Sequence, residues 1–189
     1  MNMFSKSTVL AGVATVLLGF SMSPAVAATG FTGAYAFGNW TQTLPDATAS
    51  IVGNSSFVTL VGTGEVGDDQ ARDTTFTILA SSDSIVSFNW AYSTTDEEAF
   101  LDPARFLKGV TPLQFSDNSG GLSQSGSYSN SVAMGQSFGF SVLSTDSFGG
   151  PATLTISNFN VSAVPEPGSL AMLTAGLMVV VAARKRKQS

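Results

Sequence analysis

Apolar and polar residues alternate with a period of two through the middle of the chain, between residues 29 and 163. In segment 86–92 every second residue is apolar or aromatic, and segment 138–142 repeats this pattern. Such alternation predicts β-strands with one buried face, and it places Trp90 in the core. The other segments predicted to form strands are 35–37, 57–61, 76–79, 106–107, 113–115 and 154–156, the last continuing toward 159–161.

Clusters of turn-forming residues separate these segments, at 62–64, 117–121 and 148–151. Glycine, proline, aspartate and serine at such positions supply the backbone conformations of tight turns. The middle of the chain has no helical periodicity. About nine short strands in one domain predict an all-β fold, an antiparallel β-sandwich that is jelly-roll-like, over residues 28–163.

The N-terminal segment has the three parts of a secretory signal peptide. Lys6 supplies the positive charge, residues 8–22 form an apolar helical core, and Ala25-Val26-Ala27 forms a small-residue cleavage site. We therefore expect residues 1–27 to be removed by signal peptidase after Ala27, with cleavage after Ala28 as the near alternative. An uncleaved anchor helix is the other interpretation, but the apolar run is short for a membrane span.

The C-terminal segment has a hinge, an apolar stretch and a basic end. The hinge (164–168) includes Val164, Pro165, Glu166 and Pro167. Its two prolines exclude a helix there. Residues 169–183 have no charge and predict a transmembrane helix. The basic cluster that would remain cytosolic consists of Arg184, Lys185, Arg186 and Lys187.

These last residues resemble the PEP-CTERM sorting signal of Gram-negative bacteria that make extracellular polysaccharide. The resemblance covers residues 164–189 and does not extend to the middle of the chain. It implies recognition by an exosortase, which removes the tail. The protein would then reside transiently in the inner membrane before it reaches the cell surface or the medium. An ordinary C-terminal anchor with a proline-rich stalk is the alternative interpretation.

Composition narrows the chemistry of the domain. The whole sequence contains neither cysteine nor histidine, which removes thiol and imidazole nucleophiles, zinc ligands of those types and disulfides. Between the two terminal segments, three basic residues stand against twelve acidic ones. An acidic module repels a phosphate backbone, so nucleic acid is not expected as a partner.

An internal repeat ends twice at an aspartate. The segment FNWAYSTTD (88–96) aligns without gaps on FGFSVLSTD (138–146). Each terminal aspartate could simply nucleate a turn by accepting hydrogen bonds from backbone N–H groups. Alternatively, Asp96, Asp102 and Asp146 gather at one end of the sandwich around a Ca²⁺ ion, which prefers oxygen ligands on loops. No other cofactor is expected.

Two further features bear on glycans. Trp40, beside Asn39 and Thr41, is predicted to be an exposed ring that could stack on a sugar. Asp68, Asp69 and Asp73 are predicted to lie on a solvated loop, although an opposed carboxylate pair of a glycoside hydrolase would need residues of this type. We expect a non-catalytic surface or matrix protein associated with exopolysaccharide or biofilm. A carbohydrate-binding module and, less favoured, a secreted hydrolase are the alternatives.

Overall fold

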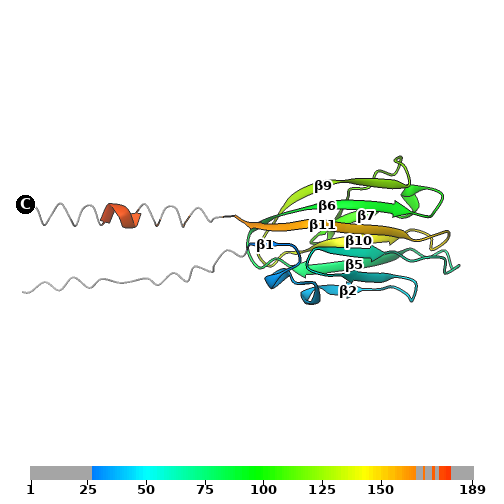
Figure 1. The fold of residues 1–189 in the computed structure, drawn as a ribbon, viewed down its shortest axis with the longest axis horizontal. Coiled ribbons are helices and arrows are strands. Elements are labelled where there is room, and N and C mark those ends of the chain that lie inside the picture. The colour runs from blue at the N-terminus through cyan, green and yellow to red at the C-terminus, as the bar shows by residue number, and fades with distance from the viewer. Residues whose placement is uncertain (1–26, 165–167, 169–171, 173–174, 180–189) are drawn as a thin grey trace, which may run out of the picture.

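Two antiparallel sheets form the domain, in a computed structural model that describes residues 27–164, 168, 172 and 175–179 (Figure 1). The six-stranded sheet contains β1 (Ala28–Thr29), β3 (Ser50–Gly53), β4 (Phe57–Val61), β6 (Ser84–Thr94), β9 (Ser123–Val132) and β11 (Ala152–Ala163). The five-stranded sheet contains β2 (Thr41–Thr43), β5 (Arg72–Leu79), β7 (Ala104–Lys108), β8 (Thr111–Gln114) and β10 (Ser137–Ser144). Three short 3₁₀ helices are η1 (Gly33–Tyr35), η2 (Phe37–Asn39) and η3 (Ala99–Leu101).

The strand order is that of a jelly roll. The first sheet has the order β3-β4-β11-β6-β9, with β1 also paired to β11, and the second has the order β2-β5-β10-β7-β8. From β4 to β11 the chain passes repeatedly between the two sheets, and every pairing is antiparallel. The prediction of an all-β antiparallel fold is confirmed.

The two strands of the internal repeat face each other across the core. Val86, Phe88, Trp90 and Tyr92 of β6 are all buried, as the alternation predicts. On β10 the side chains of Phe138, Phe140 and Val142 are fully buried. The rings of Phe88 and Phe140 meet edge to face with centroids 4.9 Å apart, a favoured aromatic geometry. Because β6 and β10 belong to different sheets, this contact joins the two layers.

Segment 35–37 is not the predicted strand. It lies across η1 and η2, which carry the chain around the edge of the sandwich. The turn brings Trp40 inward, where it is only 5% exposed and stacks on Phe76 with ring centroids 4.5 Å apart. Its indole N–H donates to the carbonyl oxygen of Tyr35 at 3.0 Å. The predicted exposed ring of Trp40 is therefore wrong, because the 3₁₀ turns point it into the aromatic core.

Strand β9 was not predicted from the sequence. Its residues are serine, glycine, glutamine and asparagine around one tyrosine, with a valine only at its end, so it shows little apolar alternation. It forms because it pairs with β6 over ten residues, from Ser84↔Val132 to Ser93↔Ser123. Tyr128 is the side chain of β9 that packs against the core from the middle of the strand. Backbone pairing to a strong neighbour thus replaces side-chain burial here.

The two ends of the domain lie side by side. Ala28 of β1 pairs with Val161 near the end of β11, and the N–H of Val164 donates to the carbonyl oxygen of Asp83 at 2.9 Å. In the predicted transmembrane segment 169–183, the described residues 172 and 175–179 are helical. Across the described residues, no helix has both the length and the apolar character that a membrane crossing requires. The signal peptide, apart from Ala27, and the basic cluster 184–187 lie outside the described residues.

Candidate functional site

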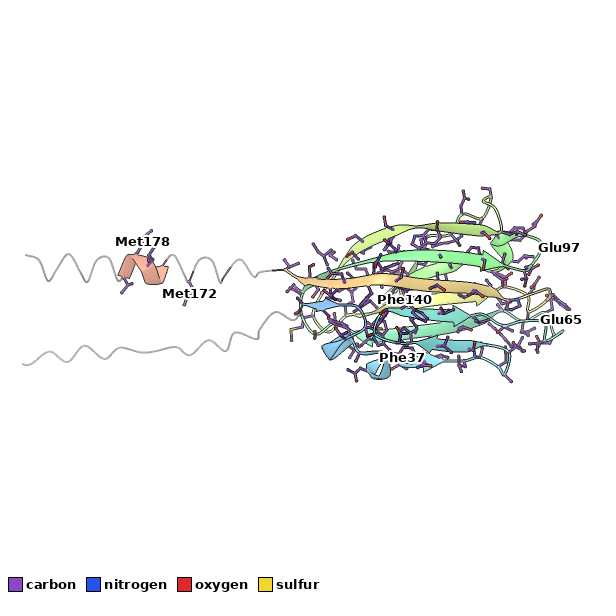
Figure 2. The ribbon with its side chains drawn as sticks, viewed as in Figure 1. Phe37, Glu65, Glu97, Phe140, Met172 and Met178 are labelled. Carbon is purple, nitrogen blue, oxygen red and sulfur yellow. The ribbon has the colours of Figure 1, made fainter. Side chains whose placement is uncertain are left out.

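The end of the sandwich opposite β1 is acidic. Figure 2 shows Glu97 and Glu65 at this end, away from the point where β11 finishes. β6 and β10 both finish here, at Thr94 and Ser144, and η3 follows β6 closely. The predicted metal ligands Asp96 and Asp102 lie on the loops that flank η3.

Thr94 ties these two aspartates together. Its hydroxyl donates to Oδ2 of Asp102 at 2.7 Å, and its Oγ1 accepts the backbone N–H of Asp96 at 3.0 Å. The backbone N–H of Glu97 also donates to Oδ1 of Asp96, at 2.6 Å. One oxygen of each carboxylate is therefore hydrogen-bonded.

The other oxygen of each carboxylate is buried and has no partner. Asp96 is 6% exposed, and Asp102 and Ser144 are each 1% exposed. Oδ2 of Asp96, Oδ1 of Asp102 and Oγ of Ser144 make no hydrogen bond. Gly149 covers Asp96 so closely that a Cβ at this position would lie 2.8 Å from Oδ1 of the carboxylate. We call Asp96, Asp102 and Ser144 the buried oxygen cluster.

The surroundings of Asp102 disfavour its charged form. Burial raises the pKa of Asp102 to about 6, and the negative charges of Asp96 and Asp146 add to the rise. The hydroxyls of Thr94 and Ser144 partly offset it. The hydroxyl of Ser144 therefore lies close to the carboxylate of Asp102, although outside the geometry of a hydrogen bond. A raised pKa suits a general acid, but a carboxylate this deeply buried is out of reach of a glycan substrate.

Asp146 lies near the buried oxygen cluster but is engaged differently. Its Oδ1 accepts the backbone N–H of Phe148 at 3.1 Å and so holds the turn after β10. Within the described part of the chain, no group of three or more acidic side chains is arranged to hold a metal ion. The structure therefore does not assemble the three predicted carboxylates around one ion: Asp96 and Asp102 are both bonded to Thr94, whereas Asp146 accepts from its own backbone.

Asp46 is a carboxylate at the same end whose oxygens are both hydrogen-bonded, and sequence reasoning missed it. Its Oδ1 accepts from the backbone N–H of Thr48 and Ala49 and from the Thr48 hydroxyl, at 2.8, 3.2 and 2.5 Å. Its Oδ2 accepts from the hydroxyl of Thr63 at 2.7 Å and lies 3.5 Å from Nε of Arg72. The motif D-A-T was its only sequence signal, since an aspartate two residues before a threonine is typical of a turn.

The basic residues near this end are paired with acids outside the buried oxygen cluster. Arg72 forms an ion pair with Asp68 at 2.5 Å, and Arg105 forms one with Asp73 at 2.5 Å across β7 and β5. Asp68 and Asp69 are exposed, as expected for a solvated loop, whereas Asp73 is part of the sheet. These residues do not form an opposed carboxylate pair, because each arginine neutralises a different aspartate.

The outer surface of the six-stranded sheet is uncharged and mostly polar, with Val52, Phe57 and Ile85 as exposed apolar side chains. The strands β1, β3, β4, β6, β9 and β11 contain no acidic or basic residue, although the domain is acidic overall. Rows of hydroxyl and amide side chains run across the strands, for example Ser127, Asn89 and Ser157 at paired positions. A shallow hollow of about 270 Å³ opens on this surface and is lined by Ser87, Phe88, Asn89, Ser127, Tyr128, Ser129 and Asn158.

Comparison with known proteins identifies the C-terminal segment. Residues 163–187 match the family described as the PEP-CTERM protein-sorting motif. The chain therefore carries a PEP-CTERM sorting signal, the mark of an exported protein that an exosortase processes at the membrane. Of its core, Val164 lies at the edge of the described domain, whereas Pro165, Glu166 and Pro167 lie outside the described residues. No curated protein matches the chain in sequence.

Several solved structures have a similar arrangement of strands. TmCBM61 in complex with β-1,4-galactotriose is 12% identical with a TM-score of 0.38, over 68% of this chain and 90% of that one. The N-terminal cellulose-binding domain of β-1,4-glucanase C from Cellulomonas fimi is 8% identical with a TM-score of 0.35, over 67% and 90%. A family 35 carbohydrate-binding module from Clostridium thermocellum is 13% identical with a TM-score of 0.33, over 74% and 100%. Values this low carry no inference about the ligand of this chain.

Proposed function

We propose that the protein is a non-catalytic component of the extracellular matrix of a Gram-negative bacterium. In this proposal exosortase processing delivers the jelly-roll domain to the cell surface or medium, where it contacts neutral exopolysaccharide. The contact surface is the outer surface of the six-stranded sheet. The observation that carries the proposal is the complete absence of charged residues from the six strands of this sheet.

The distribution of charge supports this choice of surface. The five-stranded sheet holds Arg72, Asp73, Arg105 and Lys108, so the chain does not exclude charge from strands in general. Hydroxyl and amide groups on β6, β9 and β11 can both donate and accept hydrogen bonds, as sugar hydroxyls do. A neutral polymer can approach such a surface without the cost of stripping water from unpaired ions.

Binding to neutral polysaccharide tests the proposal directly. The full chain should be retarded in native gels that contain a soluble neutral glucan or galactan, and the retardation should hold as salt is raised. Salt screens interactions between charges but leaves hydrogen bonds between neutral groups largely unchanged. Retardation that disappears at high salt, or that occurs only with an acidic polymer, would contradict the proposed surface.

Matched variants locate the contact. Asn89→Asp introduces a charge with almost no change of shape in the shallow hollow, and we expect it to weaken retardation at least several-fold. Gln42→Glu adds the same charge at an exposed position of β2 in the other sheet and serves as the control. Equal effects of the two variants would mean that net charge, and not this surface, determines binding.

Processing is tested separately in the native host. Glu166→Ala should leave an unprocessed form in the membrane fraction, because the resemblance of the motif makes this residue part of what the exosortase recognises. The secreted wild-type protein should lack both residues 1–27 and the basic cluster Arg184–Lys187. An intact mass that retains the basic cluster in secreted protein would contradict processing.

A further inference from the structure

The buried oxygen cluster is costly in the form that the structure shows. An unpartnered polar atom in the interior loses its hydrogen bonds to water and gains nothing in return. Here three such atoms, from Asp96, Asp102 and Ser144, occur together at one end of the fold. Native proteins leave few buried polar atoms unpaired, and each such atom calls for an explanation, such as a bound ion or water.

The protein supplies no positive charge to this cluster. Between residues 27 and 164 the basic residues are Arg72, Arg105 and Lys108. The two arginines are paired with Asp68 and Asp73, and Nζ of Lys108 donates to Oδ1 of Asn130 at 2.9 Å. Asp96 and Asp102 are both buried and both bonded to Thr94. Carboxylates in such a place without a counter-charge must either take up a proton or hold a cation.

The chemistry of the donors selects the cation. Two carboxylate oxygens and a hydroxyl are hard oxygen ligands on strand ends and loops, which suit Ca²⁺ better than a transition metal. The sequence contains no histidine or cysteine to attract softer ions. The sorting signal places the domain outside the cytoplasm, where calcium is far more abundant than in the cytosol. The oxygens that complete the shell would come from backbone carbonyl groups and water.

We propose that Oδ2 of Asp96, Oδ1 of Asp102 and Oγ of Ser144 bind one Ca²⁺ ion at the acidic end of the sandwich. The ion would join the loop after β6 to the end of β10, and so connect the two sheets where no strand does. This site is independent of the neutral surface of the six-stranded sheet. Its failure would leave the proposed matrix function intact.

Thermal unfolding of the full chain in mild detergent tests the site. The chain is melted in chelator, in calcium and in magnesium at equal concentration. A native-state ligand present at about a hundred times its Kd stabilises by RT ln(1 + [L]/Kd), which raises the midpoint by roughly 9 °C for a domain of this size. Magnesium prefers a tighter octahedron and keeps its waters, so it should reproduce little of the shift.

Three variants separate the site from general screening of the acidic domain. Asp102→Asn removes a ligand charge and should abolish the calcium shift. Asp69→Asn removes one charge from an exposed loop position whose φ of 54° asparagine tolerates, and it should retain the shift. Ser144→Ala removes a ligand oxygen without removing charge, and it should lower calcium affinity several-fold. It replaces Asp102→Asn as the test if that variant does not fold.

Terbium luminescence gives a second readout on the wild-type chain. Tb³⁺ occupies calcium sites, and its emission is sensitised by an aromatic ring nearby. Tyr92 is such a ring: burial raises its pKa, and the negative charge of Asp102 close by adds to the rise. The site is supported if added calcium displaces Tb³⁺ and so removes the emission, and if Asp102→Asn shows no emission. The calcium site would be overturned by equal midpoint shifts with calcium and magnesium, or by a calcium shift that survives Asp102→Asn. It would also be overturned by the absence of both shift and emission, which would leave water or a proton in the cluster.

Discussion

Asp46 and Asp102 lie at the same end of the sandwich and have opposite environments. Both oxygens of Asp46 accept hydrogen bonds, from Thr48, Ala49 and Thr63. Burial alone would raise its pKa, but these bonds outweigh burial and lower the pKa to about 2. Asp102 has one oxygen bonded and one orphaned, and burial raises its pKa to about 6. The comparison separates a carboxylate whose oxygens are both satisfied by the fold from one that the fold leaves half satisfied.

Replacing Asp46 should cause the larger loss of stability. Asp46→Ala removes the acceptor of four hydrogen bonds and leaves buried donors such as the Thr63 hydroxyl without a partner. We expect a cost of about 3 kcal/mol in chemical denaturation, the same in calcium and in chelator. Asp117→Ala is the control, because the carboxylate of Asp117 accepts hydrogen bonds from the exposed Ser119 alone. A calcium-dependent cost at Asp46 would mean that the ion lies there and not at Asp102.

The effect of replacing Asp102 on stability should have opposite signs in chelator and in calcium. In chelator at neutral pH, Asp102→Asn removes a charge that the fold disfavours, while its amide oxygen can still accept from Thr94. We expect a gain in the free energy of unfolding on the order of 2 kcal/mol. In saturating calcium the wild type should be the more stable of the two. A variant that is less stable than the wild type in chelator would show that the carboxylate is already satisfied.

The pH dependence of stability should also differ between the two carboxylates. The folded state holds the Asp102 proton more tightly than the unfolded chain does, so stability falls as pH rises from about 4 through about 6. Asp46 acts oppositely, and its contribution is lost as pH falls from about 4 toward about 2. In chelator we expect Asp102 to lower the free energy of unfolding by about 1 kcal/mol as the pH rises from 5 to 7. An equal slope in wild type and Asp102→Asn would contradict this assignment.

The alternation of side chains was enough to predict the strands that bury their own residues. β6 and β10 are found with the predicted faces, because a period of two leaves only one way to bury Phe88 and Phe140. β9 could not be predicted, since its pairing to β6 depends on a partner distant in sequence. Trp40 was misplaced because its polar neighbours Asn39 and Thr41 indicated an exposed position, whereas the preceding 3₁₀ turn directs its ring onto Phe76.

The sequence predicted where the candidate site lies but not which oxygens form it. The repeat that ends at Asp96 and Asp146 indicated that two strands finish at the same end of the sandwich. Which oxygens lie buried there depends on the turn at Gly149, which closes over Asp96, and on the approach of Ser144 to Asp102. Those contacts join segments about fifty residues apart in sequence and leave no local signal. The sorting signal needed no such contacts, since its three parts are consecutive.

A crystal structure of the protein grown in calcium would test the buried oxygen cluster most directly. The account predicts one anomalous peak in the space between Asp96, Asp102 and Ser144, with ligand oxygens at about 2.3–2.6 Å. It also predicts that the peak is absent from crystals of Asp102→Asn grown in the same solution. An electron-density peak that has no anomalous signal and lies near 2.8 Å from its neighbours, the distance of a hydrogen-bonded water, would contradict the calcium site.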